Sequence, residues 1–366
     1  VYKRQAVTDL IHELRASLKS RLYEFIERFE LDLLIAENVL SIPMHIPLAL
    51  ALTEVVAETQ LPTIAHHHDF FWERVRFSIN AVSDYLGMAF PPNLANIEHV
   101  VINSAAREEL AHRRGISSII IPNVLDFHNP PAINHQRAQA FIRSIDLNPD
   151  DCIILQPTRI VKRKGIEYAI DLVRELRPLS CKLVISHEAG DEGFEYPDWI
   201  QEYARDRQVD LRLVQTRIAG PWAGRRNMEE QYSLWDIYPF ADFITYPSRV
   251  EGFGNVFVEA VYFKKPILIN RYATFVRDID PQGFDLVVMD GFLTKKTIVK
   301  VQQILESVTR REKMVNTNYE IATRHYSYAV LQKQLNSMMI NFFGTQVPQH
   351  LKMVVRYLTQ RIKEDG

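Results

Sequence analysis

The sequence predicts an α/β protein with two domains, each built around a sheet of parallel strands. Its 366 residues exceed the usual size of one domain and suit two. In the C-terminal half, short apolar strand patterns alternate with helical patterns, which is typical of a parallel, doubly wound sheet. A strand predicted at residues 243–246 runs into a turn with two glycines and then a helix. In such sheets, ligands bind at the carboxyl ends of the strands.

The composition is that of a globular protein, with 47% hydrophobic residues and a net charge of -2. This charge argues against nucleic acid as a partner. Cys152 and Cys181 are the two cysteines, so we expect no disulfide framework or zinc site and a cytoplasmic location. The sequence shows neither a long apolar stretch that predicts a membrane span nor a signal peptide.

The N-terminal half also alternates helices and strands. Apolar residues recur at helical spacing from Val7 to Phe29, and the first five residues, VYKRQ, are set aside because they match the translation of a sequencing adapter. Asn103 or Ser104 is expected to cap a helix that Gly115 ends. The other elements predicted here are strands at 31–36, 63–65 and 98–104 and a helix at 46–59.

A polar stretch at residues 126–151, with Pro130 and Pro131, is interpreted as the hinge between the domains. We therefore expect domains at residues 1–148 and 149–346, followed by a last helix at 347–366. The second domain is predicted to contain strands at 153–156, 181–186, 210–215, 243–246 and 266–270, and to be helical from Thr294.

Two glutamates, Glu251 and Glu259, stand eight residues apart in the segment EGFGNVFVEA. The first lies in the predicted turn with Gly252 and Gly254, and the second lies about two turns along the following helix. Glycines let the backbone approach a ligand, and the amides that open a helix attract anions. The pattern favours a binding site, although a capped helix with two solvated glutamates is the alternative.

A basic turn follows the strand predicted at residues 153–156. Arg159 and Lys164 lie five residues apart, and Gly165 opens an amphipathic helix that begins at about Ile166. Cations at a helix N-terminus add to the field of the helix dipole, so the turn is suited to a phosphate or diphosphate. A basic surface turn is common, but its occurrence in the same predicted domain as the two glutamates favours the phosphate site.

These segments resemble the retaining nucleotide-sugar glycosyltransferases of the GT-B fold, family 4, also called glycosyl transferases group 1. TRIVKRKG is similar to that family's G-R-L-x-x-x-K-G segment. YPSRVEGFGNVFVEAVYFKKPIL is similar to its segment with E-G-F-G, E-A and a later proline. The resemblance covers roughly residues 60 to 340. After Pro266 the sequence INRYATFVRDI departs from the glycine pair that is frequent in the family.

The resemblance implies a GT-B architecture, in which two Rossmann-like domains with parallel sheets face a cleft. It also implies that Arg159 and Lys164 hold the donor diphosphate, and that Glu259 binds the ribose hydroxyls. Glu251 is implied to meet the donor sugar together with the amides that follow it, at Gly252, Phe253, Gly254 and Asn255. The N-terminal domain lacks the opening β-α units of the family, so we expect it to be truncated, with an exposed sheet edge.

Three histidines and Asp69 follow the strand predicted at 63–65. The family often has histidine and aspartate here, which implies that His68 and Asp69 lie at the cleft opposite the donor. Adjacent residues of a strand point to alternate faces, so three histidines in a row cannot easily ligate one ion. We expect no metal, and His66 and His67 are interpreted as packing or supporting residues.

The predicted function is transfer of a hexose from a nucleotide-diphosphate sugar to an acceptor hydroxyl. The resemblance implies retention of anomeric configuration, with the leaving phosphate taking the acceptor proton, and no metal or cofactor. The catalytic residues expected are His68, Asp69, Arg159, Lys164 and Glu251. UDP-glucose and GDP-mannose both fit as donors, and a small molecule, a glycan or a lipid fits as acceptor. Alternatives are a non-catalytic or fragment-inactivated nucleotide-sugar-binding protein and a GT-B phosphorylase or epimerase.

Overall fold

The computed structural model describes residues 2–130, 132–148, 150–187, 195–214 and 232–352. These residues form two compact units. The first unit contains the chain up to Pro122 together with a second segment that begins at Gln332. The second unit runs from Asn123 to Leu331. The sequence places the boundary later, at residue 148, and most of the last helix that it predicts lies outside the described residues.

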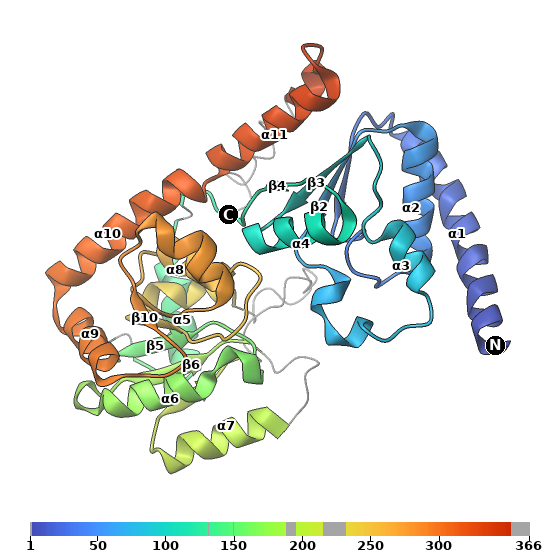
Figure 1. Cartoon of the computed structure of the whole chain (residues 1–366). Helices are drawn as coiled ribbons and strands as arrows, with labels where there is room; N and C mark the ends of the chain where they lie inside the picture. Colours follow the sequence, from blue (N-terminus) through green and yellow to red (C-terminus); the bar gives the residue numbers. More distant parts are fainter. Residues whose placement is uncertain (1, 131, 149, 188–194, 215–231, 353–366) are drawn as a thin grey trace. The chain divides into compact units, whose positions relative to one another are not determined.

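The first unit contains a parallel sheet with the strand order β1-β2-β3-β4. Each of the first three strands is followed by a helix that leads to the next strand, as the alternating pattern predicts (Figure 1). The elements are α1 (Tyr2–Arg28), β1 (Leu34–Glu37), α2 (Ile46–Thr59), β2 (Thr63–His67), α3 (Ser83–Ala89), β3 (Ile97–Val101), α4 (Ser104–Arg114) and β4 (Ile119–Ile120).

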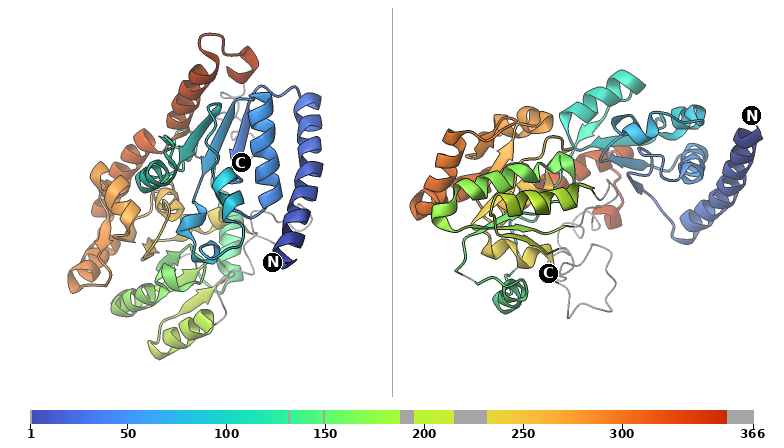
Figure 2. Two further views of the ribbon diagram at one scale, coloured as in Figure 1. Left: turned by 45° about the vertical axis from the view of Figure 1, so that its right-hand side comes forward. Right: turned by 90° about the horizontal axis from the view of Figure 1, so that it is seen from below.

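Local signals set the ends of these helices. The side chain of Asn103 accepts a hydrogen bond from the amide of Ala106 at 2.7 Å, and Gly115 ends α4 in the left-handed conformation, as predicted. Helix α1 begins at Tyr2, so most of the five residues set aside belong to it. It packs beside α2, and Lys19 lies 3.1 Å from Glu54 of that helix (Figures 1 and 2).

The C-terminal segment of the first unit continues from α11 (Tyr328–Phe343), which starts in the second unit. Asn341 donates a hydrogen bond to Glu98 of β3 at 3.3 Å. His350 lies 2.7 Å from Asp32, just before β1. The fold of the first unit is therefore completed by residues far along the chain.

The second unit contains a parallel sheet with the order β10-β9-β8-β5-β6-β7. Helix α6 packs on β5 and β6, and α8 packs on β8 and β9 (Figures 1 and 2). The elements are α5 (His135–Ser144), β5 (Ile153–Gln156), α6 (Ile166–Glu175), β6 (Lys182–Ile185), α7 (Glu195–Asp206), β7 (Leu211–Leu213), β8 (Phe243–Tyr246), α8 (Asn255–Tyr262), β9 (Ile267–Asn270), β10 (Val287–Met289), α9 (Lys295–Glu306) and α10 (Val308–His325).

Two of these elements were not expected from the sequence. Helix α5 lies within the polar stretch interpreted as a hinge, and Ala138, Phe141 and Ile142 are its buried residues. Strand β10 has only three residues and extends the sheet beside β9. The other strands of this sheet lie where the sequence predicts them, and their parallel, doubly wound arrangement is confirmed.

Two glycines let the turns after β5 and β8 pack closely. Gly165 has a φ of 62°, and a Cβ atom there would lie 2.7 Å from the carbonyl oxygen of Pro247. Gly254 has a φ of 122°, and its Cβ would lie 2.4 Å from the hydroxyl of Tyr272. The amide of Arg249 also donates to the carbonyl of Arg163 at 2.8 Å, so the backbone itself joins the two turns.

We predict that Gly254→Ala destabilises the protein, because it adds a clash with Tyr272 to backbone strain on the order of 1–3 kcal/mol. Chemical denaturation measures the change. Gly283→Ala is the matched control, since Gly283 has a φ of 82° but no atom within 4 Å of its Cβ position. Tyr272→Phe in the Gly254→Ala background should restore part of the loss. Equal destabilisation by the two glycine variants would contradict a steric role for Tyr272.

Candidate functional site

The candidate site of the second unit lies at the carboxyl ends of β5 and β8, the two central strands of its sheet. The chain leaves β5 toward β6 on one side, and later returns to place β8 on the other side. This reversal of strand order leaves space between the two following turns, and ligands of such sheets bind there. The predicted phosphate turn and the predicted glutamate turn therefore meet at the same place.

A buried ion pair joins these two turns. The ammonium group of Lys164, at the end of a 3-10 turn (Lys162–Lys164), contacts Glu251 Oε1. The two side chains are only 10% and 11% exposed. Burial lowers the pKa of Lys164, although the neighbouring Glu251 carboxylate acts to raise it. The structure thus brings together two residues that the sequence assigns to separate parts of the donor.

Further cations surround this pair. The guanidinium of Arg163 lies 3.7 Å from Glu251 Oε2. Arg159 is exposed, and the described residues offer its side chain no hydrogen bond or ion pair. Lys162 of the same 3-10 turn adds a further cation, so cations outnumber the carboxylate of Glu251 and the site has a positive field that suits an anion.

His187 is a further polar residue at this edge that the sequence analysis missed. It follows β6, and its Nδ1 lies 2.7 Å from the Ser186 hydroxyl. Burial lowers the pKa of His187, and the nearby charges of Arg159 and Lys164 lower it further. The imidazole is therefore held neutral beside the cations. Its position directly after a predicted strand was the signal available in the sequence.

Glu259 occupies a different environment from Glu251. It lies on α8, and its Oε2 accepts a hydrogen bond from the Tyr238 hydroxyl at 2.8 Å. Burial raises the pKa of Glu259, and the Tyr238 hydrogen bond acts in the opposite direction. The sequence predicts the two glutamates at different depths of one site, but it did not identify Tyr238 as the partner of Glu259.

The remaining predicted donor residues lie in the turn before α8 and at its start. Gly252 is exposed, whereas Phe253 is buried with its ring 5.3 Å from that of Tyr326. Asn255, the first residue of α8, accepts a hydrogen bond from the side chain of Asn123. Phe253 and Gly254 are buried and anchor the turn, while Gly252 before them and Asn255 after them stay exposed.

In the first unit, three polar side chains meet at the carboxyl ends of β1 and β2. His66 Nδ1 lies 2.9 Å from Glu37 Oε2, and His68 Nε2 lies 3.6 Å from the same oxygen. Hydrogen bonding to His66 and then to His68 lowers the pKa of Glu37 to about 2. Glu37 was not among the residues predicted for a site, although it directly follows the strand predicted at 31–36.

The other predicted residues of this edge have separate partners. Asp69 forms an ion pair with Arg74. His67 points away from His66 and His68 and is buried, with its Nε2 2.9 Å from Nδ1 of His99. The interpretation of His67 as a packing residue agrees with this position, whereas His66 contacts Glu37.

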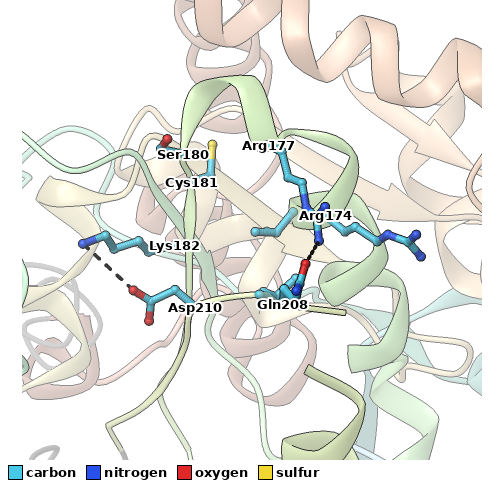
Figure 3. A pocket seen from close by; sticks show the side chains of 9 residues that line it. Arg174, Arg177, Ser180, Cys181, Lys182, Gln208 and Asp210 are labelled. Carbon is cyan, nitrogen blue, oxygen red and sulfur yellow. Dashed lines mark hydrogen bonds and ion pairs between the residues drawn. The ribbon is translucent and has the colours of Figure 1, made fainter. Parts of the chain in front are cut away.

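A second concave region of the second unit is drawn in Figure 3. Its lining includes residues just before β6 and β7, so it lies at the amino-terminal end of the sheet, opposite to the end that carries the predicted site. It is a pocket of about 320 Å³ whose charged lining residues are Arg174, Arg177, Lys182 and Asp210. Arg177 donates to the carbonyl of Arg207 at 2.9 Å and to Gln208 at 3.0 Å, and Lys182 is 3.0 Å from Asp151. Arg177 and Lys182 of this pocket thus form hydrogen bonds and ion pairs within the protein, unlike Arg159.

The strand order defines a doubly wound α/β protein, and the cations gathered at its switch point suit an anion. Residues 138–321 match the family described as Glycosyl transferases group 1. The chain therefore belongs to this family, and the predicted GT-B fold class is confirmed. Among the described residues, no helix is both long and apolar enough to span a membrane.

Two relatives are mannosylglucosylglycerate synthases. The chain is 38% identical over 283 residues to that of Petrotoga mobilis, which covers 71% of this chain and 64% of the relative. It is 31% identical over 359 residues to that of Thermotoga maritima, which covers 90% of this chain and 78% of the relative. The chain thus spans less than two thirds of the length of the Petrotoga protein.

Solved structures show the same fold at low sequence identity. A glycosyltransferase from Rickettsia africae superposes with a TM-score of 0.66 at 14% identity, covering 90% of this chain and 81% of that one. Anabaena HepE in complex with UDP-glucose superposes with a TM-score of 0.64 at 11% identity, covering 88% and 82%.

The pair of buried histidines predicts acid sensitivity of the first unit. Burial lowers the pKa of His67 well below its usual value and that of His99 to about 4. In the unfolded chain these imidazoles bind protons below about pH 6.5, whereas in the folded protein they stay neutral until about pH 4. Unfolding is therefore accompanied by proton uptake between about pH 6.5 and 4. Stability should therefore fall over this range as the pH is lowered, by about 3 kcal/mol for His99 alone.

Denaturation curves at several pH values measure this effect. His99→Asn keeps a hydrogen-bonding group near Nδ1 but does not titrate, and we expect a shallower loss of stability in acid for this variant. An identical pH dependence in the two proteins would show that His99 does not contribute.

Proposed function

We propose that this protein is a retaining hexosyltransferase that uses a nucleoside diphosphate sugar and forms mannosylglucosylglycerate. The observation that carries the proposal is the positive site at the carboxyl ends of β5 and β8, where Arg159 is exposed beside the Lys164–Glu251 pair. The names of the two relatives support this product. Its formation from glucosylglycerate requires transfer of a mannosyl group, so the proposed donor is a nucleoside diphosphate mannose.

The proposed donor site uses side-chain cations for the diphosphate. An ammonium group has three donors, so Lys164 can keep its contact with Glu251 while it donates to a phosphate oxygen. Arg159 supplies a guanidinium that is not engaged elsewhere in the described part of the chain, and guanidinium groups bind phosphate oxygens in pairs. The charge that grows on the leaving diphosphate is thereby stabilised, and no metal is required at this site.

The two glutamates are proposed to bind different parts of the donor. Glu251 is held by Lys164 at the edge where the phosphates bind, so it is suited to contact the transferring sugar. Glu259 lies along α8, where Tyr238 fixes one of its oxygens and leaves the other for the ribose hydroxyls. With front-face attack, the leaving phosphate takes the acceptor proton, so neither glutamate acts as a nucleophile.

The acceptor is proposed to bind to the first unit, at the carboxyl ends of β1 and β2. His68 is partly exposed there, and its backbone amide is fixed by Asn38 at 3.1 Å. An imidazole in this position can hydrogen-bond an acceptor hydroxyl. Asp69 is paired with Arg74, so its proposed role is to hold that arginine in place.

We predict that the protein, supplied with glucosylglycerate and GDP-mannose, yields mannosylglucosylglycerate, which mass spectrometry detects.

We also predict that Arg159→Ala and Lys164→Ala each weaken the binding of a nucleoside diphosphate. Loss of one charge-assisted phosphate contact costs about 1.5–3 kcal/mol, or roughly 10- to 150-fold in affinity. Isothermal titration calorimetry with GDP and UDP measures the affinity.

Arg177→Ala, in the pocket at the other end of the sheet, is the control and should leave this affinity unchanged. Nucleotide binding that survives both site variants but is lost with Arg177→Ala would move the anion site to that pocket. Binding without product in the presence of a full panel of nucleotide sugars would indicate a binding protein in place of a transferase.

We predict that Glu251 and Glu259 separate in steady-state kinetics. Glu259→Gln should mainly raise the donor KM, because a ribose contact is similar in the ground and transition states. Glu251→Gln should lower kcat, because its contact is to the reacting sugar. Unchanged turnover in Glu251→Gln, measured at saturating donor, would show that the assigned role is wrong.

A further inference from the structure

We propose that Glu37, His66 and His68 form a binding site for a divalent transition metal in the first unit. Among the described residues, this is the group of histidine and carboxylate side chains whose ligand atoms lie close enough to hold one ion, all within 4.8 Å of one another. The site is separate from the diphosphate site of the second unit, but it shares His68 with the acceptor site proposed above, so a bound ion would meet the acceptor hydroxyl in place of the imidazole. It departs from the absence of a metal that the sequence analysis expects.

The distances within the group suit a metal. Nδ1 of His66 and Nε2 of His68 lie 2.9 Å and 3.6 Å from one oxygen of Glu37. Ligands that bind one ion at about 2.1 Å in tetrahedral geometry are roughly 3.4 Å from each other. The two distances to the Glu37 oxygen are therefore close to ligand spacing, and all three ligand atoms lie within 4.8 Å of one another. The two imidazole rings are tilted by 52° with centroids 4.7 Å apart.

The backbone explains why these three side chains meet. Strands β1 and β2 pair in parallel, with Glu37 directly beside His66. Alternate residues of an extended chain point to the same face, so His66 and His68 lie on the face of Glu37 while His67 points to the other. His67 is buried against His99. Because side chains alternate between the two faces, three adjacent histidines cannot all bind one ion, but His66 and His68 lie on the same face and can bind it together.

Asn38 holds the group in place. Its backbone amide donates to the carbonyl of His66 at 2.8 Å. Its side-chain oxygen accepts from the amide of His68 at 3.1 Å and from the Ser41 hydroxyl at 2.6 Å. Asn38 itself has a φ of 57°, a conformation that asparagine adopts more readily than most residues. The ligands are therefore fixed by the backbone around them, which favours metal binding over loose contact between flexible side chains.

The ligand set indicates which metals bind. Two imidazoles and one carboxylate suit Zn²⁺, Co²⁺ or Ni²⁺, whereas Mg²⁺ and Ca²⁺ prefer oxygen ligands. Three protein ligands leave at least one coordination position for water or for an oxygen of a bound substrate. The side chains of Glu37 and His68 are 60% and 46% exposed, so an ion can enter from solvent.

The test uses the full chain, prepared without a histidine tag and stripped of metal with a chelator. Co²⁺ is added, and binding is followed by its visible absorption, which reports ligand number and geometry. We expect one Co²⁺ per chain, displaced by Zn²⁺ and not by millimolar Mg²⁺. His66→Gln, His68→Gln and Glu37→Gln should each weaken binding at least about tenfold.

His112→Gln is the matched control, because His112 is an exposed histidine of α4 in the same unit. It should leave Co²⁺ binding unchanged. Circular dichroism shows whether each variant is folded, and Glu37→Gln, which keeps the shape of the side chain, decides the result if a histidine variant unfolds. Absent Co²⁺ absorption, binding that survives all three substitutions, or displacement by Mg²⁺ would each overturn the proposal.

Discussion

The ion pair between Lys164 and Glu251 is the constraint on which the second unit's site depends. It joins the turns after the two central strands, and both partners are largely removed from water. A buried pair of this kind is costly to break, because either partner left alone is an uncompensated charge. The glycines at 165 and 254 make the close approach possible, and the backbone hydrogen bond from Arg249 to Arg163 reinforces it. Exposed Arg159 can therefore meet an anion at a surface that is already organised.

The two units place polar residues in the same way. In each, the residues of interest follow parallel strands at their carboxyl ends, where helices and turns leave the sheet edge open. The second unit uses cations and one paired carboxylate, which suit a phosphate. The first uses imidazoles around a carboxylate, which suit a metal or hydroxyl groups. The difference arises from the residues at the carboxyl ends of the strands.

The sequence predicted most of the second unit, because strands such as 153–156 and 243–246 are short apolar runs bounded by turns. Helix α5 was missed, since only three buried residues mark it within a polar stretch, and β10 was missed because three residues carry little pattern. Arg159, Lys164 and Glu251 were proposed as site residues from their spacing, but the pairing of Lys164 with Glu251 joins residues 87 positions apart. Likewise, Glu37 and His66 meet through strand register, which no local pattern contains. Such contacts depend on the tertiary fold.

The return of the chain to the first unit after Gln332 has a consequence for how the protein is made. Asn341 and His350 contact Glu98 and Asp32, which are synthesised more than two hundred residues earlier. During translation, the first unit must therefore wait, without these contacts, until the whole of the second unit has left the ribosome. The second unit also joins distant residues, since the Tyr319 hydroxyl donates to the carbonyl of Phe127, but its described residues, up to Leu331, are all synthesised before Asn341. Asp32, just before β1, is the residue that waits longest for its partner, because His350 is synthesised after both sheets are complete.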